Sequence, residues 1–552
     1  MSGTGTGHCG PLVSVLISTY NRPMYIGEAL QSIFAQSYGN FELILVRDGG
    51  LPVKDVAERF DDPRLVFIDR DRNRGLPYSF NEALASARGE YVCYLGDDDC
   101  FYSRHIELLV GALEKQNEYG AAYSDLYKAH CRVTRDGRRI VLAKNLEISR
   151  DFDRMLMLQF NHALHVSVMH KRELIERAGG YNESLNVLID WDLTRKLCFY
   201  TDFLHVPVVT GQYYAPVGDC DRISVQRRKN VNEYLRNLLT IRTTRPPKPW
   251  DKIADLGVLI AAQRLDESLE RTLLDLWSHS FYPKKIFVPL TEAEFGAFKT
   301  AVPNVVTVKA ERGESIEIRI ERMLRQCDAE FVAVVPCGIN VEADEVCFLE
   351  KSLYPLLSGD NRQVFELDES QGQRWGATMR TELLAESRRR FGDMGIREGL
   401  EAVGAGIRKP KFEEYPFLFD HFLSAAELTE RDGDWGRAAR IYEYIEQRCG
   451  NELWMQIRRA NALYHLGRWQ VGAKTAEGIN SVRPTAASLL VEARCRKKMN
   501  DFEGAIRLYE QAEAILDGRC EGRFDTEKII SADKENAATR QSAEQREAMV
   551  WT

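Results

Sequence analysis

Strand-like and helix-like patterns alternate along the first hundred residues of this chain. Residues 13–17, "VSVLI", form a β-branched apolar run typical of a buried strand, and residues 26–38, "IGEALQSIFAQSY", place apolar side chains at helical spacing. Residues 41–50, "FELILVRDGG", then have the pattern of a second strand that ends in a turn. Because further strands and helices continue this alternation, the sequence predicts an α/β fold whose largely parallel sheet carries helices on both faces.

Polar residues follow three of the predicted strands. Residues 18–22 come after the first strand, Asp48 ends the second, and residues 97–99, all aspartate, follow the apolar run "YVCYL". Since ligands bind beyond the carboxyl ends of strands in such sheets, these residues are expected to converge. Neighbouring carboxylates repel each other by on the order of 1 kcal/mol even in water. A divalent cation would offset that repulsion, and the alternative is a solvated acidic turn.

Four motifs in sequence order resemble glycosyltransferase family 2 with the GT-A, Rossmann-like fold. They are "VSVLISTYNRP", "ELILVRDGG", "NRGLPYSFNEALASARGEYVCYLGDDD" and "LIDWDLTRKL", within about residues 11 to 240. The resemblance implies inverting transfer of a sugar from a nucleotide-sugar donor, a UDP-sugar being favoured, with a Mn²⁺ or Mg²⁺ cofactor. Asp98 matches the family's metal ligand, and Asp97 is a possible second ligand that also lies near the sugar and ribose. Asp99 either forms a hydrogen bond or faces solvent.

The resemblance also implies a set of donor-binding residues. Tyr20 matches the tyrosine that lies against the base, and the alternative is an aromatic side chain packed in the core. Asp48 matches an acid that contacts the base, and the alternative is a turn cap. The chain departs from the family pattern at Arg47, Gly50 and Gly96. The complete set is Ser18, Thr19, Tyr20, Arg22, Asp48, Arg74 and Asp97.

A general base for the acceptor hydroxyl is expected in "NVLIDWDLTRKL", where Asp190 and Asp192 point to different sides of a helix. Asp190 matches the family's catalytic acid, and the alternative is a helix N-cap. His162 and His165 are candidates to line the site, and the favoured interpretation of both is a structural role. Arg222 or Arg227 is the candidate for the basic residue that closes over the diphosphate, since the comparable loop lacks histidine.

An internal repeat follows the first domain. "LGVLIAAQRLDES" can be aligned with "VSVLISTYNRPMY", and "AEFVAVVPCGIN" with "GEYVCYLGDDDC". In this alignment Tyr20 becomes Gln263, Asp48 becomes Thr291, and the aspartates at 97 and 98 become Cys337 and Gly338. The apolar pattern survives without the carboxylates, so we expect a degenerate, non-catalytic GT-A-like domain.

From about residue 412 a helical period near 34 replaces the alternation and resembles tetratricopeptide repeats. Aromatic residues recur at Trp435, Trp469 and Phe502, and a small residue follows each of them three positions later. The predicted domains are therefore residues 1–245, catalytic, residues 246–408, GT-A-like, residues 409–518, helical repeats, and residues 519–552, a polar tail.

Composition excludes several other classes of protein. The net charge is −8, the longest apolar runs are far shorter than a membrane helix, and the 12 cysteines form no C-x-x-C pair. We expect a cytoplasmic enzyme, or one held peripherally at the inner face of the membrane, without nucleic acid as a partner. A glycan, lipid-linked or protein acceptor and a protein partner on the repeats remain open, and bacterial lipopolysaccharide or capsule assembly is the favoured role. A non-catalytic nucleotide-sugar-binding scaffold is the rival interpretation.

Overall fold

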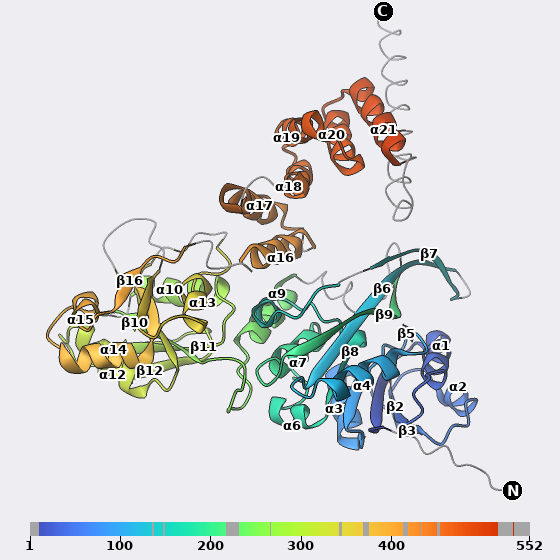
Figure 1. Cartoon of the computed structure of the whole chain (residues 1–552), viewed down its shortest axis with the longest axis horizontal. Coiled ribbons are helices and arrows are strands. Elements are labelled where there is room, and N and C mark those ends of the chain that lie inside the picture. The colour runs from blue at the N-terminus through green and yellow to red at the C-terminus, as the bar shows by residue number, and fades with distance from the viewer. Residues whose placement is uncertain are drawn as a thin grey trace, which may run out of the picture. The chain divides into compact units, whose positions relative to one another are not determined.

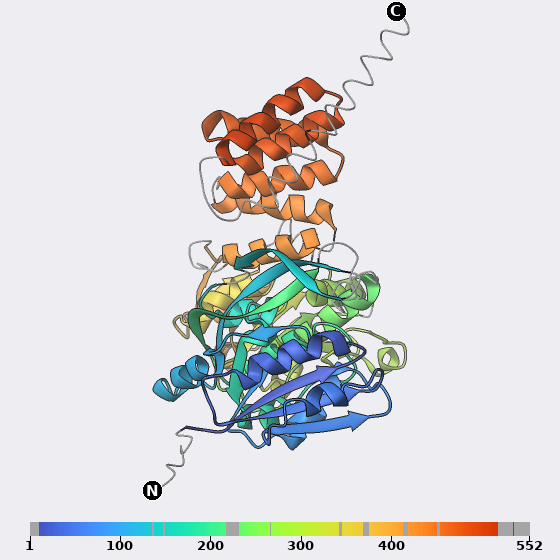
Figure 2. The same ribbon diagram turned by 90° about the vertical axis from the view of Figure 1, so that its right-hand side faces the viewer.

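The computed structural model describes most of the chain (Figures 1 and 2). The described residues are 10–134, 137–146, 149–216, 231–264, 266–339, 341, 345–367, 375–411, 418–431, 433–449, 453–516 and 534. Two compact units are found: residues 1–338 with 361–364 and 375–406, and residues 339–360 with 365–374 and 407–552. The finer boundaries at 245, 408 and 518 stay predictions.

The first sheet has the strand order β3-β2-β1-β4-β8-β6-β9-β5, with β7 beside β6. The strands β3 to β4 in this order run parallel, whereas β8 is antiparallel to β4 and to β6. The sheet is therefore mixed, and the predicted parallel arrangement holds for its first half and for the β6–β9 pair. The strands are β1 Val13–Thr19, β2 Phe41–Asp48, β3 Leu65–Arg70, β4 Tyr91–Tyr94, β5 Cys100–Phe101, β6 Ala121–Val133, β7 Arg139–Leu146, β8 Val168–Lys171 and β9 Phe203–Pro216.

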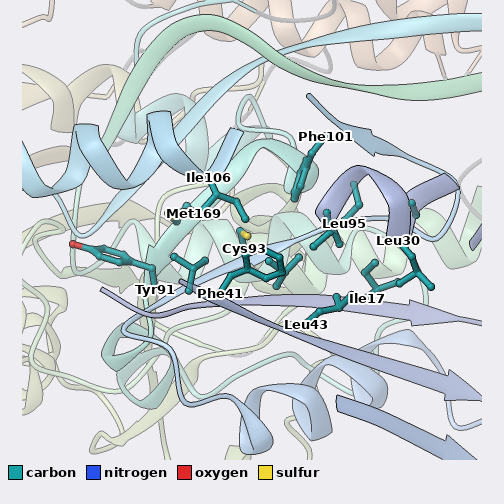
Figure 3. Packing of buried hydrophobic residues seen from close by; sticks show 14 of the residues in the cluster. Ile17, Leu30, Phe41, Leu43, Tyr91, Cys93, Leu95, Phe101, Ile106 and Met169 are labelled. Carbon is teal, nitrogen blue, oxygen red and sulfur yellow. The ribbon is translucent and has the colours of Figure 1, made fainter. Parts of the chain in front are cut away.

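Helices cover both faces of this sheet, as the alternation predicts. One face packs its apolar side chains against α1 and α4, with Ile17, Leu43 and Cys93 on the strands and Leu30 and Ile106 on the helices (Figure 3). The opposite face carries α3, whose Phe80 packs edge-on against Tyr94 at 5.5 Å between ring centroids. The helices are α1 Pro23–Phe34, α2 Lys54–Glu58, α3 Leu76–Ser86, α4 His105–Lys115, α5 Arg154–Gln159, α6 Glu173–Ala178, α7 Ile189–Leu197 and α9 Val231–Thr243, with a 3₁₀ turn, η1, at His165–Ser167.

The second sheet, in the order β12-β11-β10-β13-β15-β14-β16, repeats the arrangement of the first over its first five strands. Val13 pairs with Phe41 and Tyr91 in the first sheet, and Leu256 pairs with Lys284 and Phe331 in the second. These are the pairs that the sequence alignment predicts, and an antiparallel strand follows the fourth strand in both sheets. The duplicated topology confirms the internal repeat in its strand order and register.

The second sheet is built from β10 Leu256–Ala261, β11 Lys284–Leu290, β12 Val305–Lys309, β13 Phe331–Pro336, β14 Gln363–Glu366, β15 Ala377–Arg380 and β16 Gly406–Arg408. Its helices are α10 Glu267–Ser278, α11 Glu292–Phe295, α12 Ile316–Gln326, α14 Thr381–Arg390 and α15 Ile396–Ala402.

Paired helices form the C-terminal region: α16 Leu418–Arg431, α17 Trp435–Cys449, α18 Leu453–His465, α19 Trp469–Val482, α20 Ala486–Lys498 and α21 Phe502–Leu516. Each predicted aromatic position begins the second helix of a pair, and the small residues Ala438 and Ala505 are fully buried. At Gly472 an added Cβ would lie 3.1 Å from the Cys495 sulfur and 3.3 Å from the Ala460 carbonyl oxygen. The small residue is therefore needed for close approach of α19 to its neighbours. The predicted tail lies outside the described residues.

The helix α13, Glu350–Leu357, belongs to the same compact unit as these C-terminal helices. The Lys351 ammonium lies 5.6 Å from the centroid of the Tyr444 ring, and the Tyr354 and His421 rings are 6.2 Å apart. A segment in the middle of the sequence repeat thus packs with the helical region.

Candidate functional site

The loop after β4 joins two of the predicted polar clusters. Thr19 Oγ1, at the end of β1, donates a hydrogen bond of 2.8 Å to Asp97 Oδ2. Arg22 Nη1, just before α1, lies 2.9 Å from Asp98 Oδ2 and 3.4 Å from Asp97 Oδ1. The predicted convergence of residues 18–22 with the acidic cluster is confirmed for Thr19 and Arg22, and Ser18 is half-buried.

The charged groups of this loop are compatible with a bound cation. Burial and the nearby charge of Asp98 raise the pKa of Asp97 to about 7, although Arg22 and Thr19 favour its ionised form. Among the described residues no group of three His, Cys, Asp or Glu could enclose a metal. Asp97 and Asp98 offer two neighbouring carboxylates, and Mg²⁺ or Mn²⁺ commonly takes only one or two protein carboxylates and shares its coordination with substrate phosphates and water. The residues present therefore fit a metal held together with the donor.

Asp99 and Gly96 shape the same loop. Asp99 is buried, and its Oδ1 accepts a 3.3 Å hydrogen bond from the backbone N–H of Tyr214. A Cβ at Gly96 would lie 2.4 Å from Asp99 Oδ2, so a larger residue would displace that carboxylate. The alternative of a solvated acidic turn is therefore wrong for Asp97 and Asp99, and the departure from the family pattern at Gly96 has a steric reason.

Sequence reasoning missed Arg139, which comes from β7 and supports the acidic loop. Its Nη1 donates to the backbone carbonyl oxygen of Asp98, and its Nη2 donates to Glu28 Oε2 at 2.5 Å. The guanidinium carbon lies 3.5 Å from the centroid of the Tyr214 ring and 4.6 Å from that of Tyr25. A planar, always charged group suits this stacked position better than an ammonium. No local motif marks Arg139, since the contacts come from three distant segments.

Glu28, whose side chain is 49% exposed, completes this network. Burial alone would raise the pKa of its carboxyl, but hydrogen bonds from Tyr214 and Arg139 and the charge of Arg139 outweigh it, so the pKa is lowered. Tyr214 Oη donates to Glu28 Oε1 at 2.7 Å. The ionised pair thereby fixes β7 and β9 to α1 beside the acidic loop.

Asp48 is enclosed by its own loop. Its Oδ1 accepts hydrogen bonds from the Arg74 backbone N–H at 2.8 Å and from Arg70 Nη1 at 2.9 Å. Its Oδ2 accepts one from the Gly75 backbone N–H at 2.9 Å. Asp48 therefore holds residues 74–75 in place, and its predicted contact with a base stays a prediction.

Two other predicted donor residues are exposed. Tyr20 is 48% exposed, so the alternative that it packs in the core is wrong. Arg74 is exposed, with its guanidinium carbon 3.2 Å from the centroid of the Tyr78 ring. Both side chains border the polar loops, and a planar aromatic and a planar cation are suited to stacking on a base.

The loop that follows β2 explains two departures from the family pattern. Gly50 has φ of 73°, and a Cβ there would lie 2.2 Å from Asn21 Oδ1, which accepts a 2.9 Å hydrogen bond from the Leu51 N–H. Arg47 forms an ion pair with Asp69 and donates to the Gly50 carbonyl oxygen at 2.9 Å. Gly50 thus allows the close contact between the loops after β1 and β2, while Arg47 joins the loop after β2 to β3.

Asp190 and Asp192 have the distinct surroundings expected from their spacing. The helix α7 has Leu188 at its N-cap position, so the N-cap alternative for Asp190 is wrong. Asp190 Oδ2 accepts a hydrogen bond of 3.1 Å from Asn161 Nδ2. Burial raises the pKa of Asp190 despite this bond and others from the helix backbone. Asp192 is buried and pairs with Lys196 at 2.7 Å, which gives it a structural partner.

Arg195 fixes the helix that carries Asp190. Its fully buried guanidinium donates at 2.7 Å to the carbonyl oxygens of Thr244 and Arg242, and at 3.3 Å to that of Leu158. These bonds tie α7 to the ends of α5 and α9.

The two histidines are structural, as predicted. His165 Nε2 bonds to Tyr181 Oη at 2.6 Å, and burial lowers the pKa of His165 to about 3. His162 Nε2 accepts a 3.2 Å hydrogen bond from the Asp153 N–H. Arg222 and Arg227 lie outside the described residues.

The positions in the second sheet that correspond to the site serve local structure. Thr291 is the N-cap of α11 and forms a capping box with Glu294. Cys337 Sγ lies 3.1 Å from Ser268 Oγ, and the Gly338 N–H donates to Thr272 Oγ1 at 2.9 Å. Gln263 is exposed. None of the four corresponding residues offers a carboxylate to a metal.

Comparison with known proteins identifies the family of the first sheet. The family "Glycosyl transferase family 2" matches residues 14–173. A "PGL/p-HBAD biosynthesis glycosyltransferase" of Mycobacterium bovis is 30% identical over 210 residues, which cover 36% of this chain and 76% of the relative. The chain belongs to glycosyltransferase family 2. This glycosyltransferase is also 37% identical over 115 residues to the putative glycosyltransferase EpsE of Bacillus subtilis, covering 20% of this chain and 41% of EpsE.

Solved structures with some likeness to this glycosyltransferase include S. aureus TarS 1–349 in complex with UDP-GlcNAc, at 17% identity and a TM-score of 0.34, over 43% of this chain and 68% of the other. Another is the mannosyltransferase PcManGT of Pyrobaculum calidifontis in complex with GDP-Man and Mn²⁺, at 22% identity and a TM-score of 0.31, over 43% and 66%. In the described part of this glycosyltransferase, no helix is long and apolar enough to cross a bilayer.

Proposed function

We propose that the first sheet carries out metal-dependent, inverting transfer of a sugar from a nucleotide-sugar donor, a UDP-sugar being favoured, to an acceptor hydroxyl. The observation that supports it most is the meeting of Thr19 and Arg22 with the carboxylates of Asp97 and Asp98 at the carboxyl ends of β1 and β4. This is the place where α/β sheets bind ligands.

The acidic loop supplies the donor half of the reaction. Asp98, with Asp97 beside it, would hold a Mn²⁺ or Mg²⁺ ion, which when bound neutralises the charge that develops on the leaving diphosphate. The positive charge of Arg22 offsets the negative charges of the Asp97 and Asp98 carboxylates, because its guanidinium group lies within ion-pair distance of both. Arg139 fixes the backbone of Asp98, so the direction of that carboxylate is set before a donor binds.

Asp190 is the proposed base. A carboxylate whose pKa is raised by burial is a better proton acceptor at neutral pH than an exposed one. Asn161 orients it by donating to Oδ2, so the carboxylate is held in place to accept the proton of the acceptor hydroxyl. The charge of Asp190 also reaches Tyr181, which bonds to His165 and packs edge-on against Tyr94 of β4. The base and the acidic loop are thus linked through one aromatic cluster.

The acceptor proposed is a bacterial surface glycan or glycolipid, since the relatives of this chain include a PGL/p-HBAD biosynthesis glycosyltransferase. The second sheet, which repeats the topology without the carboxylates, is proposed to be a non-catalytic GT-A-like domain. The C-terminal helices, with their tetratricopeptide-like pattern, are proposed to bind the acceptor or a protein partner.

A panel of nucleotide sugars tests this function. Each is incubated with the full chain in the presence of Mn²⁺, Mg²⁺ or EDTA, and free nucleotide is measured by chromatography. We expect metal-dependent hydrolysis of one donor, with release of a sugar of inverted anomeric configuration. Asp98→Asn should abolish it, and the exposed Asp71→Asn should leave it unchanged. A retained configuration, or turnover in EDTA equal to that in Mn²⁺, would refute the proposal.

A further inference from the structure

The hairpin of β6 and β7 has an unusual combination of exposed side chains. Residues 126–146 contain six Lys or Arg and one Asp in sequence, whereas the whole chain has a net charge of −8. Among the described residues of the hairpin, the exposed basic side chains are Arg132, Arg138 and Lys144, while only 6% of the Arg139 side chain is exposed. In the same hairpin, large apolar side chains are exposed at Val133, Ile140, Val141 and Leu146. The register places Ile140 on one face of the hairpin, beside Arg132, and Val133 and Val141 on the other face, so apolar side chains are exposed on both faces. Scattered exposed apolar residues are ordinary, but four within one short hairpin are typical of an interaction site.

Basic and apolar side chains lie directly beside each other there. Arg132 on β6 pairs with Ile140 on β7, and cross-strand partners share one face of a sheet. Arg132 is exposed, and Ile140 is 43% exposed. Lys144 and Leu146, both exposed, lie two residues apart farther along β7. Arg132 and Lys144 therefore each have an exposed apolar neighbour.

The hairpin is also fixed beside the donor site. In Figure 1 it forms a long bent ribbon at one end of the first sheet, and β7 pairs with β6 alone among the described strands. Arg139, in the same strand as Ile140, is bonded to Glu28 and to the Asp98 backbone. A partner that binds to this hairpin is consequently held at a fixed distance from the acidic loop.

We propose that the β6–β7 hairpin, through its described residues 126–134 and 137–146, docks on an anionic lipid surface and so presents the site to an acceptor embedded in that surface. The role in presenting the acceptor rests on the proposed function, whereas the binding of the hairpin to lipid does not. Basic groups are attracted to anionic headgroups, while neighbouring aliphatic side chains enter the boundary between headgroups and acyl chains.

Other partners fit this hairpin less well. A second copy of the chain in a symmetric dimer would set the same basic surface against itself, which is repulsive. A single-stranded nucleic acid is bound by basic groups interleaved with aromatic rings, whereas the exposed apolar side chains here are aliphatic. Lysine and arginine on an edge strand also discourage edge-to-edge pairing, but that role does not account for Ile140 and Leu146.

Vesicle co-sedimentation with the full chain tests the proposal. We expect binding to vesicles of phosphatidylcholine with one third phosphatidylglycerol, little binding to phosphatidylcholine alone, and loss of binding as salt is raised from 0.1 to 0.5 M, amounts chosen to span the screening range. Arg132→Glu should weaken binding by roughly 5- to 30-fold. Ile140→Ser should weaken it by about 3- to 10-fold, since it removes an aliphatic group from the lipid boundary.

Matched controls lie on other exposed surfaces of the same unit. Lys54→Glu in α2 and Leu274→Ser in α10 change the same kinds of exposed side chain and should bind vesicles as the wild type does. Equal binding to neutral and anionic vesicles, or unchanged binding by Arg132→Glu, would overturn the proposal. A salt-sensitive dimer in place of vesicle binding would assign the hairpin to a second copy and overturn it equally.

Donor hydrolysis in the same preparations separates this proposal from the proposed function. Arg132 and Ile140 point to the face of the hairpin opposite to Arg139, so Arg132→Glu and Ile140→Ser should hydrolyse donor in solution at the wild-type rate. If the wild type binds anionic vesicles but hydrolyses no donor, the proposed function fails and the docking surface stands. If it hydrolyses donor but binds no vesicle, the docking surface fails alone. Should either variant fail to fold, the salt and lipid dependence of the wild type decides.

Discussion

Replacement of Asp97 by asparagine should make the metal-free protein more stable at alkaline pH. Burial and the charge of Asp98 raise the pKa of this carboxyl from 3.8 to about 7. The folded state then keeps its proton to a higher pH than the unfolded state does. Since stability falls with pH wherever the folded state binds more protons, the wild type loses stability as pH rises from about 4 to about 7.

The size of the effect follows from the shift in pKa. A shift of about three pKa units corresponds to about 4 kcal/mol at pH 8, and relaxation around the ionised group reduces this to about 2 to 4 kcal/mol. Asparagine cannot ionise, and its carbonyl oxygen can still accept the hydrogen bond from Thr19. The Asp97→Asn protein should therefore match the wild type near pH 4 and exceed it increasingly up to pH 8.

Urea unfolding of both proteins at a series of pH values, without metal, measures this difference. The exposed Asp71→Asn serves as the control and should track the wild type throughout. A saturating mixture of Mn²⁺ and UDP should reduce the difference in unfolding free energy between the two proteins, since the mixture binds the folded wild type preferentially. A stability difference that is flat between pH 4 and pH 8, or an asparagine variant less stable than the wild type at pH 8, would refute the reasoning.

Three further predictions concern other parts of the chain. Arg139→Lys should weaken Mn²⁺ binding about tenfold, measured as free Mn²⁺ by electron paramagnetic resonance, because the backbone carbonyl group of Asp98 loses its hydrogen bond from the guanidinium group. Unchanged affinity would show that this hydrogen bond does not support the metal site. Gly472→Val should destabilise the helical region by about 1 to 3 kcal/mol in thermal unfolding, since the site is overpacked, whereas Gly478→Val on the same helix, with nothing near its Cβ position, should cost less than about 1 kcal/mol; equal losses would contradict the packing argument. Asp192→Asn should destabilise the fold by about 3 kcal/mol by breaking a buried ion pair, while Asp190→Asn should abolish sugar transfer without that loss, and the opposite assignment would exchange their roles.

The sequence predicts the elements that depend on local pattern. The first strands and helices, the internal repeat and its register, and the paired C-terminal helices all follow from apolar periodicity. The convergence of Thr19 and Arg22 with the acidic loop follows from the rule that parallel strands end at one edge. The placement of α13 with the C-terminal helices does not follow, because contacts such as that between Lys351 and Tyr444 join segments far apart in sequence.

Some residues of the candidate site can likewise be predicted from the sequence, and others cannot. Residues in motifs, such as Asp98 and Asp190, are found from sequence, whereas Arg139 is not, since its partners come from α1, β9 and the acidic loop. Asp48 is the intermediate case. Its motif is visible, but only the structure shows that both of its oxygens accept hydrogen bonds from its own unit.

The location of bound metal tests the central claim most directly. Crystals of the full chain soaked with Mn²⁺ and UDP, with diffraction collected near the manganese absorption edge, would reveal the ion through its anomalous signal. The account predicts one strong peak beside the Asp98 carboxylate, with the uridine near Tyr20, and its loss in Asp98→Asn crystals treated identically. A peak near Cys337 in the second sheet, or nucleotide bound in the first sheet with no ion at Asp98, would contradict it.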